Sequence, residues 1–157
     1  MEKSITITRT VERPLEVVIG LLESDARSVL SSATETATEA ANDVVIHLEG
    51  AWRWFDVDET VTAELGELEK TRSSARLPVG WKADKNKRLL PSLDGNLGVY
   101  SLSAKHSELS YTATYAPPLG LFGGVEDFVL GRRILEAVLG RFLDEIVRHI
   151  EALVPQD

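Results

Sequence analysis

The sequence predicts an α+β domain in which a curved antiparallel sheet of about seven strands wraps around a long C-terminal helix. Two short helices are expected after the first strand. Three observations predict this class. The middle of the chain alternates apolar and polar residues with the period of half-buried strands. The last segment carries an apolar stripe at helical spacing. The length of 157 residues suits a single domain over residues 1–157.

The N-terminal part predicts one strand followed by two helical stretches. Residues 4–11 alternate β-branched apolar residues with threonine, which indicates a half-buried strand. Pro14 suits the first position of a helix, where a missing N–H costs nothing. The apolar residues of that helix share one face: Leu15, Val18, Ile19 and Leu22. A second short helical stretch contains Val29 and Leu30 and ends at Ser31.

The middle of the chain predicts an antiparallel sheet with one face in water. Residues 34–117 are rich in strand patterns separated by turn-forming residues. Alternation is clearest at 60–65, 75–83 and 109–115, where each segment has one apolar and one polar side. Residues 52–57 do not alternate cleanly, so the strand boundaries there stay open.

The C-terminal segment, roughly Val125 to Val154, predicts a helix on the order of 45 Å long that ends before Pro155. Its apolar stripe consists of Phe128, Leu135, Val138, Leu139, Phe142, Ile146, Ile150 and Leu153. The opposite face carries i, i+4 charge pairs: Arg132–Glu136, Arg141–Glu145 and Asp144–Arg148. The stripe must be buried, and the concave face of the sheet is the large surface available. A curved sheet over a long helix leaves room for a pocket lined by apolar residues.

Composition disfavours several classes of function. Lys and Arg total 17 against 25 Asp and Glu, so the formal net charge is −8, and the pI is about 4.9. Such a surface repels phosphate backbones, so we expect no nucleic-acid partner. No apolar run approaches the ~20 residues of a membrane span, and residues 1–5 show no apolar signal core. We therefore expect a cytoplasmic protein without membrane insertion. The oligomeric state stays open.

The sequence contains no motif for binding a metal or a cofactor. The chain has no cysteine, which removes thiol nucleophiles, Cys-type zinc sites and iron–sulfur clusters. His47, His106 and His149 lack metal-ligand spacing, so we expect no metal and no cofactor. His149 shares the apolar stripe with Phe142. A bond to a backbone carbonyl is the preferred interpretation for it, and a ligand contact or an acid/base role is the alternative.

Glycines around the C-terminal helix have mainly structural interpretations. Residues 120–124 are glycine-rich but lack a nucleotide-binding pattern, so we interpret them as a flexible turn or a lid over a pocket mouth. Gly131 lies on the apolar side of the helix, where close packing of the sheet is preferred over room for a ligand. Gly140 falls on the opposite side and is assigned no role. No serine lies in a nucleophile motif.

Aromatic strand residues are the main candidates for a binding site. Trp81, Tyr111 and Tyr115 share the apolar parity of their strands, so they should point beneath the helix. A buried tyrosine hydroxyl needs a partner, which could be a ligand, another side chain or water. The Trp52–Trp54 segment is a weak candidate for base stacking on so acidic a chain. A basic cluster is either a solvated turn or a guide for an acidic ligand: Lys82, Lys85, Lys87 and Arg88.

Several segments together resemble the SRPBCC superfamily, also called START-like, and within it the polyketide cyclase/dehydrase and lipid-transport group. The resemblance covers nearly the whole chain, and its motifs are structural rather than catalytic. They are Ile5–Ile7 leading into Arg13–Val18, then Leu77–Ala83, Leu90–Leu97 and Tyr111–Gly120. The chain departs from the family at Ser31–Thr34, where members often carry tryptophan and proline. The pocket mouth on that side is therefore expected to differ.

The resemblance implies the helix-grip fold and the binding or transport of a small hydrophobic ligand, either a lipid or a polyketide-like aromatic molecule. The expected lining residues are Trp81, Tyr111, Tyr115, Phe122, Phe128, Leu135, Phe142 and His149. Two alternatives stay open. One is a polyketide cyclase or dehydratase that uses the same cavity, with no catalytic residue identified. The other is a regulatory module that binds a protein partner and no small ligand, for which we expect a filled core and an exposed apolar patch.

Overall fold

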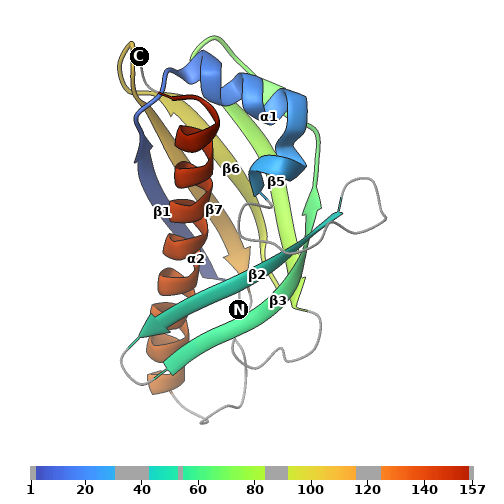
Figure 1. Cartoon of the computed structure of the whole chain (residues 1–157). Helices are drawn as coiled ribbons and strands as arrows, with labels where there is room; N and C mark the ends of the chain where they lie inside the picture. Colours follow the sequence, from blue (N-terminus) through green and yellow to red (C-terminus); the bar gives the residue numbers. More distant parts are fainter. Residues whose placement is uncertain (1–2, 31–42, 53–54, 84–91, 116–124, 156–157) are drawn as a thin grey trace.

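A computed structural model describes residues 3–30, 43–52, 55–83, 92–115 and 125–155 (Figure 1). For side chains the description covers residues 3–24, 63–82, 92–115, 132–133 and 135–155. The elements follow in this order: β1 (Lys3–Val11), α1 (Leu15–Leu30), β2 (Asp43–Trp52), β3 (Phe55–Leu65), β4 (Glu69–Lys70), β5 (Ser74–Ala83), β6 (Asp94–Ser101), β7 (Ser107–Tyr115) and α2 (Val125–Leu153). The α+β class is confirmed.

The sheet is antiparallel and curves around α2. Its strand order is β1-β7-β6-β5-β3-β2, and the short β4 pairs with β5, so the expected seven strands are present. The strand β5 joins two parts of the sheet. Its first half pairs with β6, from Ser74↔Tyr100 to Pro78↔Asn96, and its second half pairs with β3, from Val79↔Leu65 to Ala83↔Val61. Figure 1 shows β2 and β3 crossing the N-terminal part of α2 at a steep angle to β1 and β7.

The helix α1 is one continuous helix, so the expectation of two short helices is wrong. Its first turn is closed by the amides of Val17 and Val18, which donate to the carbonyl of Pro14 at 3.1 and 3.2 Å. The segment 23–28 joins the two predicted stretches and contains neither proline nor glycine. Because nothing there breaks the backbone hydrogen bonds, the helix continues to Leu30.

The helix α2 begins and ends where the sequence predicts. Its Arg132–Glu136 pair forms at 3.2 Å. The predicted Asp144–Arg148 pair is wrong. Arg9 of β1 donates to Asp144 at 2.7 Å, and Arg148 donates to Glu145 instead, at 2.9 Å. Because β1 lies beside this side of α2, a side chain from the strand reaches the carboxylate and displaces the local partner (Figure 1).

Gly140 has a packing role, which corrects the expectation that it has none. It is buried, and a Cβ built on it would lie 2.6 Å from the Nη2 atom of Arg9. The Arg9 guanidinium therefore lies over Gly140, where α2 has no side chain, and bonds Asp144 one turn further along. The glycine lets β1 and α2 approach closely.

Arg13 fastens the C-terminal end of α2 to the rest of the fold. The residue is only 7% exposed, and its guanidinium donates to the carbonyls of Glu12, Glu151 (at 2.9 Å) and Val154. Ser107 donates from its hydroxyl to the Arg13 carbonyl at 2.8 Å. The last carbonyls of a helix lack partners within the helix, and a cation there complements the helix dipole. This role is not visible in the sequence, which marked Arg13 only as the start of the Arg13–Val18 segment.

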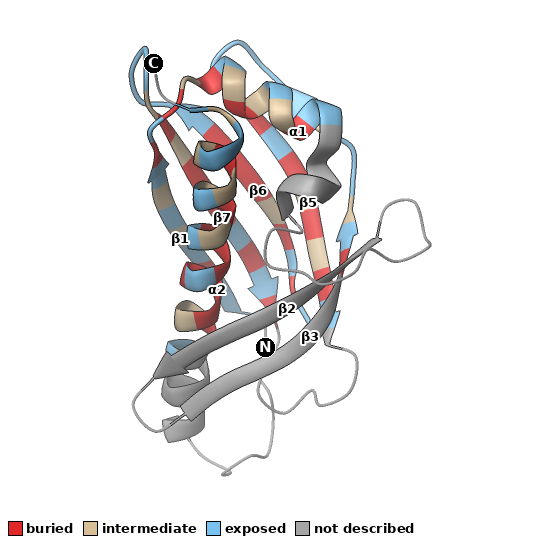
Figure 2. Ribbon diagram, in the orientation of Figure 1, coloured by how far each residue is buried: buried red, intermediate tan, exposed pale blue. Residues whose placement is uncertain are grey.

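The core lies between the sheet and α2. Figure 2 shows buried positions along β5, β6 and β7 and on the side of α2 that faces them. Alternate residues of β7 are buried, and their neighbours Thr112 and Thr114 are exposed. The largest fully buried side chains are Trp81, Tyr111, Phe142, Leu97, Leu109, Leu135, Leu139 and Leu143. The predicted stripe of α2 thus packs on the concave face of the sheet from Leu135 to Ile150. Its last member, Leu153, is 49% exposed, which corrects that part of the prediction, and the side chain of Phe128 lies outside the described residues.

Candidate functional site

Three aromatic rings meet where α2 crosses the concave face of the sheet. Trp81 comes from β5, Tyr111 from β7 and Phe142 from α2. The Trp81 and Tyr111 rings stack with centroids 6.0 Å apart, and Phe142 meets both edge-on at 5.7 and 6.3 Å. Offset and edge-to-face arrangements are the favourable ones for aromatic pairs. The prediction that the strand aromatics point inward is confirmed, because Trp81, Tyr111 and Tyr115 are all buried.

The Tyr111 hydroxyl donates to the backbone carbonyl of Val79 at 2.6 Å. This carbonyl lies where the regular pairing of β5 with β6 stops. The register ends at Pro78↔Asn96 and returns only as an isolated bridge between Trp81 and Leu93. The Tyr111 hydroxyl therefore donates to a carbonyl that lies where the pairing of β5 with β6 is interrupted. Neither a ligand nor water is needed to satisfy the hydroxyl.

Gly95 makes room for that phenol. A Cβ at this position would lie 2.9 Å from the Tyr111 hydroxyl oxygen and 2.5 Å from the carbonyl oxygen of Thr112. Burial, and next the negative charge of Asp94, raise the pKa of Tyr111 well above its usual value. The phenol is therefore a neutral hydrogen-bond donor at physiological pH.

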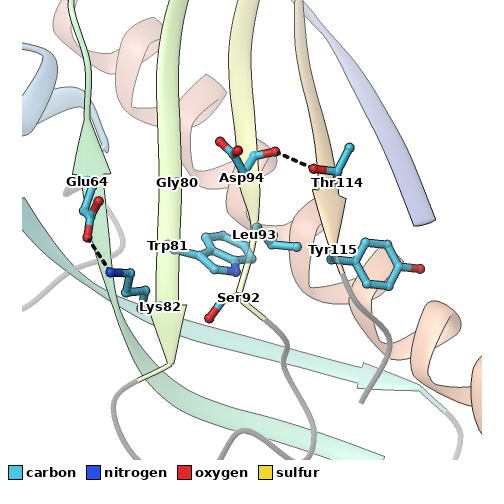
Figure 3. A pocket seen from close by; sticks show the side chains of 9 residues that line it. All are labelled: Glu64, Gly80, Trp81, Lys82, Ser92, Leu93, Asp94, Thr114 and Tyr115. Carbon is cyan, nitrogen blue, oxygen red and sulfur yellow. Dashed lines mark hydrogen bonds and ion pairs between the residues drawn. The ribbon is translucent and has the colours of Figure 1, made fainter. Parts of the chain in front are cut away.

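A hollow of about 420 Å³ lies at the edge of the sheet where β5 and β7 end and β6 begins (Figure 3). Figure 3 looks from the face away from α2, since the strands follow in the reverse order of Figure 1. Three buried side chains lie on its apolar side: Trp81, Leu93 and Tyr115. The other lining residues belong to the polar face of the sheet: Glu64, Gly80, Lys82, Ser92, Asp94 and Thr114. The hollow thus joins a polar rim to aromatic side chains of the interior.

The rim carries three charged groups. The Lys82 ammonium lies 3.3 Å from a carboxylate oxygen of Glu64, across the β3–β5 pair. Thr114 donates from its hydroxyl to the backbone carbonyl of Asp94 at 3.4 Å (Figure 3). Within the described part of the chain, the Asp94 carboxylate itself accepts no hydrogen bond and joins no ion pair. Among the described residues, the Asp94 carboxylate is therefore the unpaired charge of the rim.

The comparisons place this architecture among known folds. No family model matches the chain, and no curated protein matches it. Solved structures do. The Zhui aromatase/cyclase from Streptomyces sp. R1128 is similar over 99% of this chain and 98% of its own, with a TM-score of 0.58 and 17% identity. The chain has the helix-grip fold. A STAR-related lipid transfer protein from Xanthomonas axonopodis superposes over 94% of this chain and 85% of its own (TM-score 0.52, 14% identity). Ara h 8.0201 is similar over 97% of this chain and 99% of its own, with a TM-score of 0.53 and 8% identity.

The predicted site residues divide into three groups within this helix-grip chain. Trp81 and Tyr115 line the hollow. Tyr111, Leu135 and Phe142 belong to the buried core. Phe122 and the side chain of Phe128 lie outside the described residues, so their place in the site stays a prediction. Other residues named by the sequence also lie outside them: Ser31–Thr34, residues 120–124, Trp54, Lys85, Lys87 and Arg88. The same holds for the side chains of His47 and Trp52 and for the surroundings of Gly131.

His149 corrects one expectation. Its Nε2 atom is buried and finds no hydrogen-bond partner, so the expected bond to a backbone carbonyl is absent at this nitrogen. The residue lies seven positions, close to two helical turns, after Phe142, which places it on the same flank of α2. His106, in contrast, has its Nδ1 atom 3.0 Å from the Ser103 hydroxyl.

The helix-grip chain offers a second, smaller hollow near the end of α2. It measures about 210 Å³ and is lined by Glu12, Arg13, Pro14, Val17, Lys105, Val154 and Pro155. The sequence did not predict it, because its residues come from three distant segments that meet only in the folded chain. Arg13 and Glu12 bond the end of α2, and Ser107 bonds Arg13. Among the described residues, no group of three or more histidines and carboxylates could hold a metal ion. None of the described helices is long and apolar enough to cross a membrane.

Proposed function

We propose that this helix-grip chain binds a small hydrophobic ligand, either a lipid or a polyketide-like aromatic molecule, in the hollow at the edge of the sheet. The sequence placed this site between the sheet and the C-terminal helix, whereas no residue of α2 is among the described lining residues. The observation that carries the proposal is the 420 Å³ hollow, which has Trp81, Leu93 and Tyr115 on its apolar side. Its volume falls in the range of ~300–1,000 Å³ that is usual for small-molecule sites.

Two features of the hollow favour an elongated or flat ligand. The apolar side of the hollow includes Trp81 and Tyr115, and Trp81 in turn packs on the buried rings of Tyr111 and Phe142. The rim supplies hydroxyl and charged groups from the polar face of the sheet. A ligand would bury its apolar body against the rings and keep its polar end at the rim. Similar folds named as an aromatase/cyclase and a lipid transfer protein support this class of ligand.

A thermal-shift screen over fatty acids, sterols, flavonoids and aromatic polyketides tests the proposal. A ligand present at 100 times its Kd stabilises the folded state by about 2.7 kcal/mol. For a chain of this size that corresponds to a rise in Tm of roughly 5–10 °C. A flat response to all four classes would contradict the proposal and favour the regulatory module without a small ligand.

A pair of variants on β7 locates the binding. Thr114→Trp places a large side chain at the rim of the hollow, whereas Thr112→Trp places the same side chain on the same strand and face, outside the lining residues. Both positions are exposed, so both variants should fold. We expect Thr114→Trp to weaken binding about ten-fold or more and Thr112→Trp to leave it within about two-fold. Equal effects would place the ligand elsewhere.

A cyclase or dehydratase activity is the second candidate, favoured by the buried Nε2 atom of His149, a nitrogen with no partner in the described structure. Because His149 does not line the hollow, this candidate requires a ligand that reaches beyond the lining residues. Such a nitrogen could take a proton from a polyketide chain or return one. Mass spectrometry of a linear polyketide analogue incubated with the protein tests this. Turnover that is lost in His149→Gln while binding remains would support the enzyme. Binding without any product would support a carrier.

A further inference from the structure

We infer that the hollow at the ends of β5, β6 and β7 selects ligands whose polar end is neutral or positively charged and discriminates against carboxylates, with Asp94 as the residue that sets this preference. The inference deepens the proposed function and rests on it. It concerns the chemistry of the polar end of the ligand, which the apolar interior does not determine.

The geometry of Asp94 is the first step. Asp94 is the first residue of β6 and lines the hollow beside Thr114 (Figure 3). The Thr114 hydroxyl bonds the backbone carbonyl of Asp94 rather than its carboxylate. In the part of the chain that the structure describes, no ion pair or hydrogen bond neutralises that carboxylate. A ligand group that enters the rim would therefore meet an uncompensated negative charge.

The remaining charges of the rim leave that negative charge in place. The Lys82 ammonium is held 3.3 Å from Glu64, so these two charges offset each other. Glu64, Asp94 and Lys82 together give −1 − 1 + 1 = −1 for the lining residues. The chain as a whole carries −8 and adds a weak repulsion for anions. Of the predicted basic cluster, Lys82 is the one member that the structure describes, and it is paired with Glu64. Among the described residues, the cluster therefore leaves the Asp94 charge unneutralised.

The charge of Asp94 also affects a buried group, the Tyr111 hydroxyl. Together with burial, it raises the pKa of the Tyr111 hydroxyl, which lies on the inner side of the opening between β5 and β6. Hydroxyl groups of Ser92 and Thr114 stand at the same rim and can bond to an alcohol, a phenol or an ammonium group. A carboxylate at this place would be repelled by Asp94, and an ammonium would be attracted.

Three ligands that differ in one group provide the test: naphthalen-1-ylmethanamine, naphthalen-1-ylmethanol and 1-naphthoate. They share one aromatic body and carry a positive, a neutral and a negative end near neutral pH. By titration calorimetry at low salt, we expect the amine to bind about ten-fold more tightly than the carboxylate, with the alcohol between them. The preference should shrink at about 0.5 M salt, because exposed charges are screened there.

Asp94→Asn removes the charge and keeps the shape. It should reduce the preference for the amine over the carboxylate to about three-fold or less. Glu108→Gln is the matched control, because Glu108 lies on the same face of the sheet but does not line the hollow, and it should leave the preference unchanged. Melting curves of both variants verify that they fold.

The outcomes separate this inference from the proposed function. A carboxylate that binds the unmodified protein as tightly as the amine overturns the inference while leaving ligand binding intact. A preference that persists in Asp94→Asn overturns the role of Asp94. If none of the three compounds binds while a lipid or a polyketide from the screen does, the inference is rejected for this rim and the proposed function stands. If nothing in either set binds, both fail.

Discussion

The bond from the Tyr111 hydroxyl to the Val79 carbonyl should contribute measurably to stability. Tyr111→Phe removes the phenolic oxygen and little else, since the ring keeps its contacts with Trp81 and Phe142. The variant loses a buried hydrogen bond and leaves the Val79 carbonyl without this donor. Removing one partner of a buried bond costs about 1–3 kcal/mol, because the remaining group stays desolvated. We therefore expect unfolding to become easier by about 2 kcal/mol.

Urea denaturation and calorimetry measure this change. About 2 kcal/mol corresponds to a fall in Tm of roughly 4–8 °C for a domain of this size. Tyr115→Phe is the control, because the structure assigns no hydrogen bond to the Tyr115 hydroxyl among the described residues, and it should change unfolding by less than about 0.5 kcal/mol. If Tyr111→Phe is as stable as the unmodified protein, the bond to Val79 is not a stabilising part of the fold.

The raised pKa of Tyr111 predicts how the stability of the folded protein changes at alkaline pH. The folded state raises the pKa of Tyr111 above the unfolded value of about 10, so it favours the protonated phenol. Its contribution to stability is therefore complete below pH ~10 and is lost as the pH rises toward the raised folded pKa. Tyr111→Phe should show a smaller loss of stability above pH ~10 than the unmodified protein. Equal losses in both would show that Tyr111 does not contribute to alkaline unfolding.

Three further substitutions follow from single contacts. Gly95→Ala places a Cβ 2.5 Å from the Thr112 carbonyl oxygen and should cost more than about 2 kcal/mol in urea unfolding, whereas a cost below about 0.5 kcal/mol would contradict the close contact. Arg13→Leu frees the carbonyls at the end of α2 and should speed amide exchange there, which unchanged exchange would refute. His149→Leu removes an unpartnered buried nitrogen and should leave stability unchanged or raise it by up to ~1 kcal/mol, so a clear loss would reveal a missing partner.

Elements that depend on local pattern were predictable. The stripe of α2 and the alternation of β7 each follow from one short period in the sequence, and both are confirmed. The break in α1 was predicted wrongly, because the polar segment 23–28 separates the apolar residues of its two halves, although nothing in that segment stops the backbone hydrogen bonds. Gly140 was misjudged for a related reason. Its partner, Arg9, lies far away in the chain and is brought to it only by the packing of β1 on α2.

The candidate site was predictable only in part. Parity alone directed Trp81, Tyr111 and Tyr115 inward, and the structure agrees. Parity could not show that Tyr111 would bond the Val79 carbonyl, because that bond depends on where the pairing of β5 and β6 is interrupted. It also could not identify Asp94, whose residue type and position are ordinary for the start of a strand. Its importance arises from Lys82, the nearby cation, being paired with Glu64.

The interruption between β5 and β6 connects the shape of the sheet to the site. Near Val79, β5 gains β3 on one edge, while its regular pairing with β6 on the other edge is interrupted and returns at the Trp81–Leu93 bridge. At this interruption a backbone carbonyl lacks its regular strand partner, and Tyr111 supplies a donor across the space that Gly95 leaves open. The polar hollow lies at the same place, lined by Gly80 and Asp94. A strand that stayed paired with β6 along its full length would satisfy Val79 without Tyr111 and would leave no interruption beside the hollow. The Tyr111 bond and the hollow proposed for the ligand therefore lie at the same interruption of the sheet.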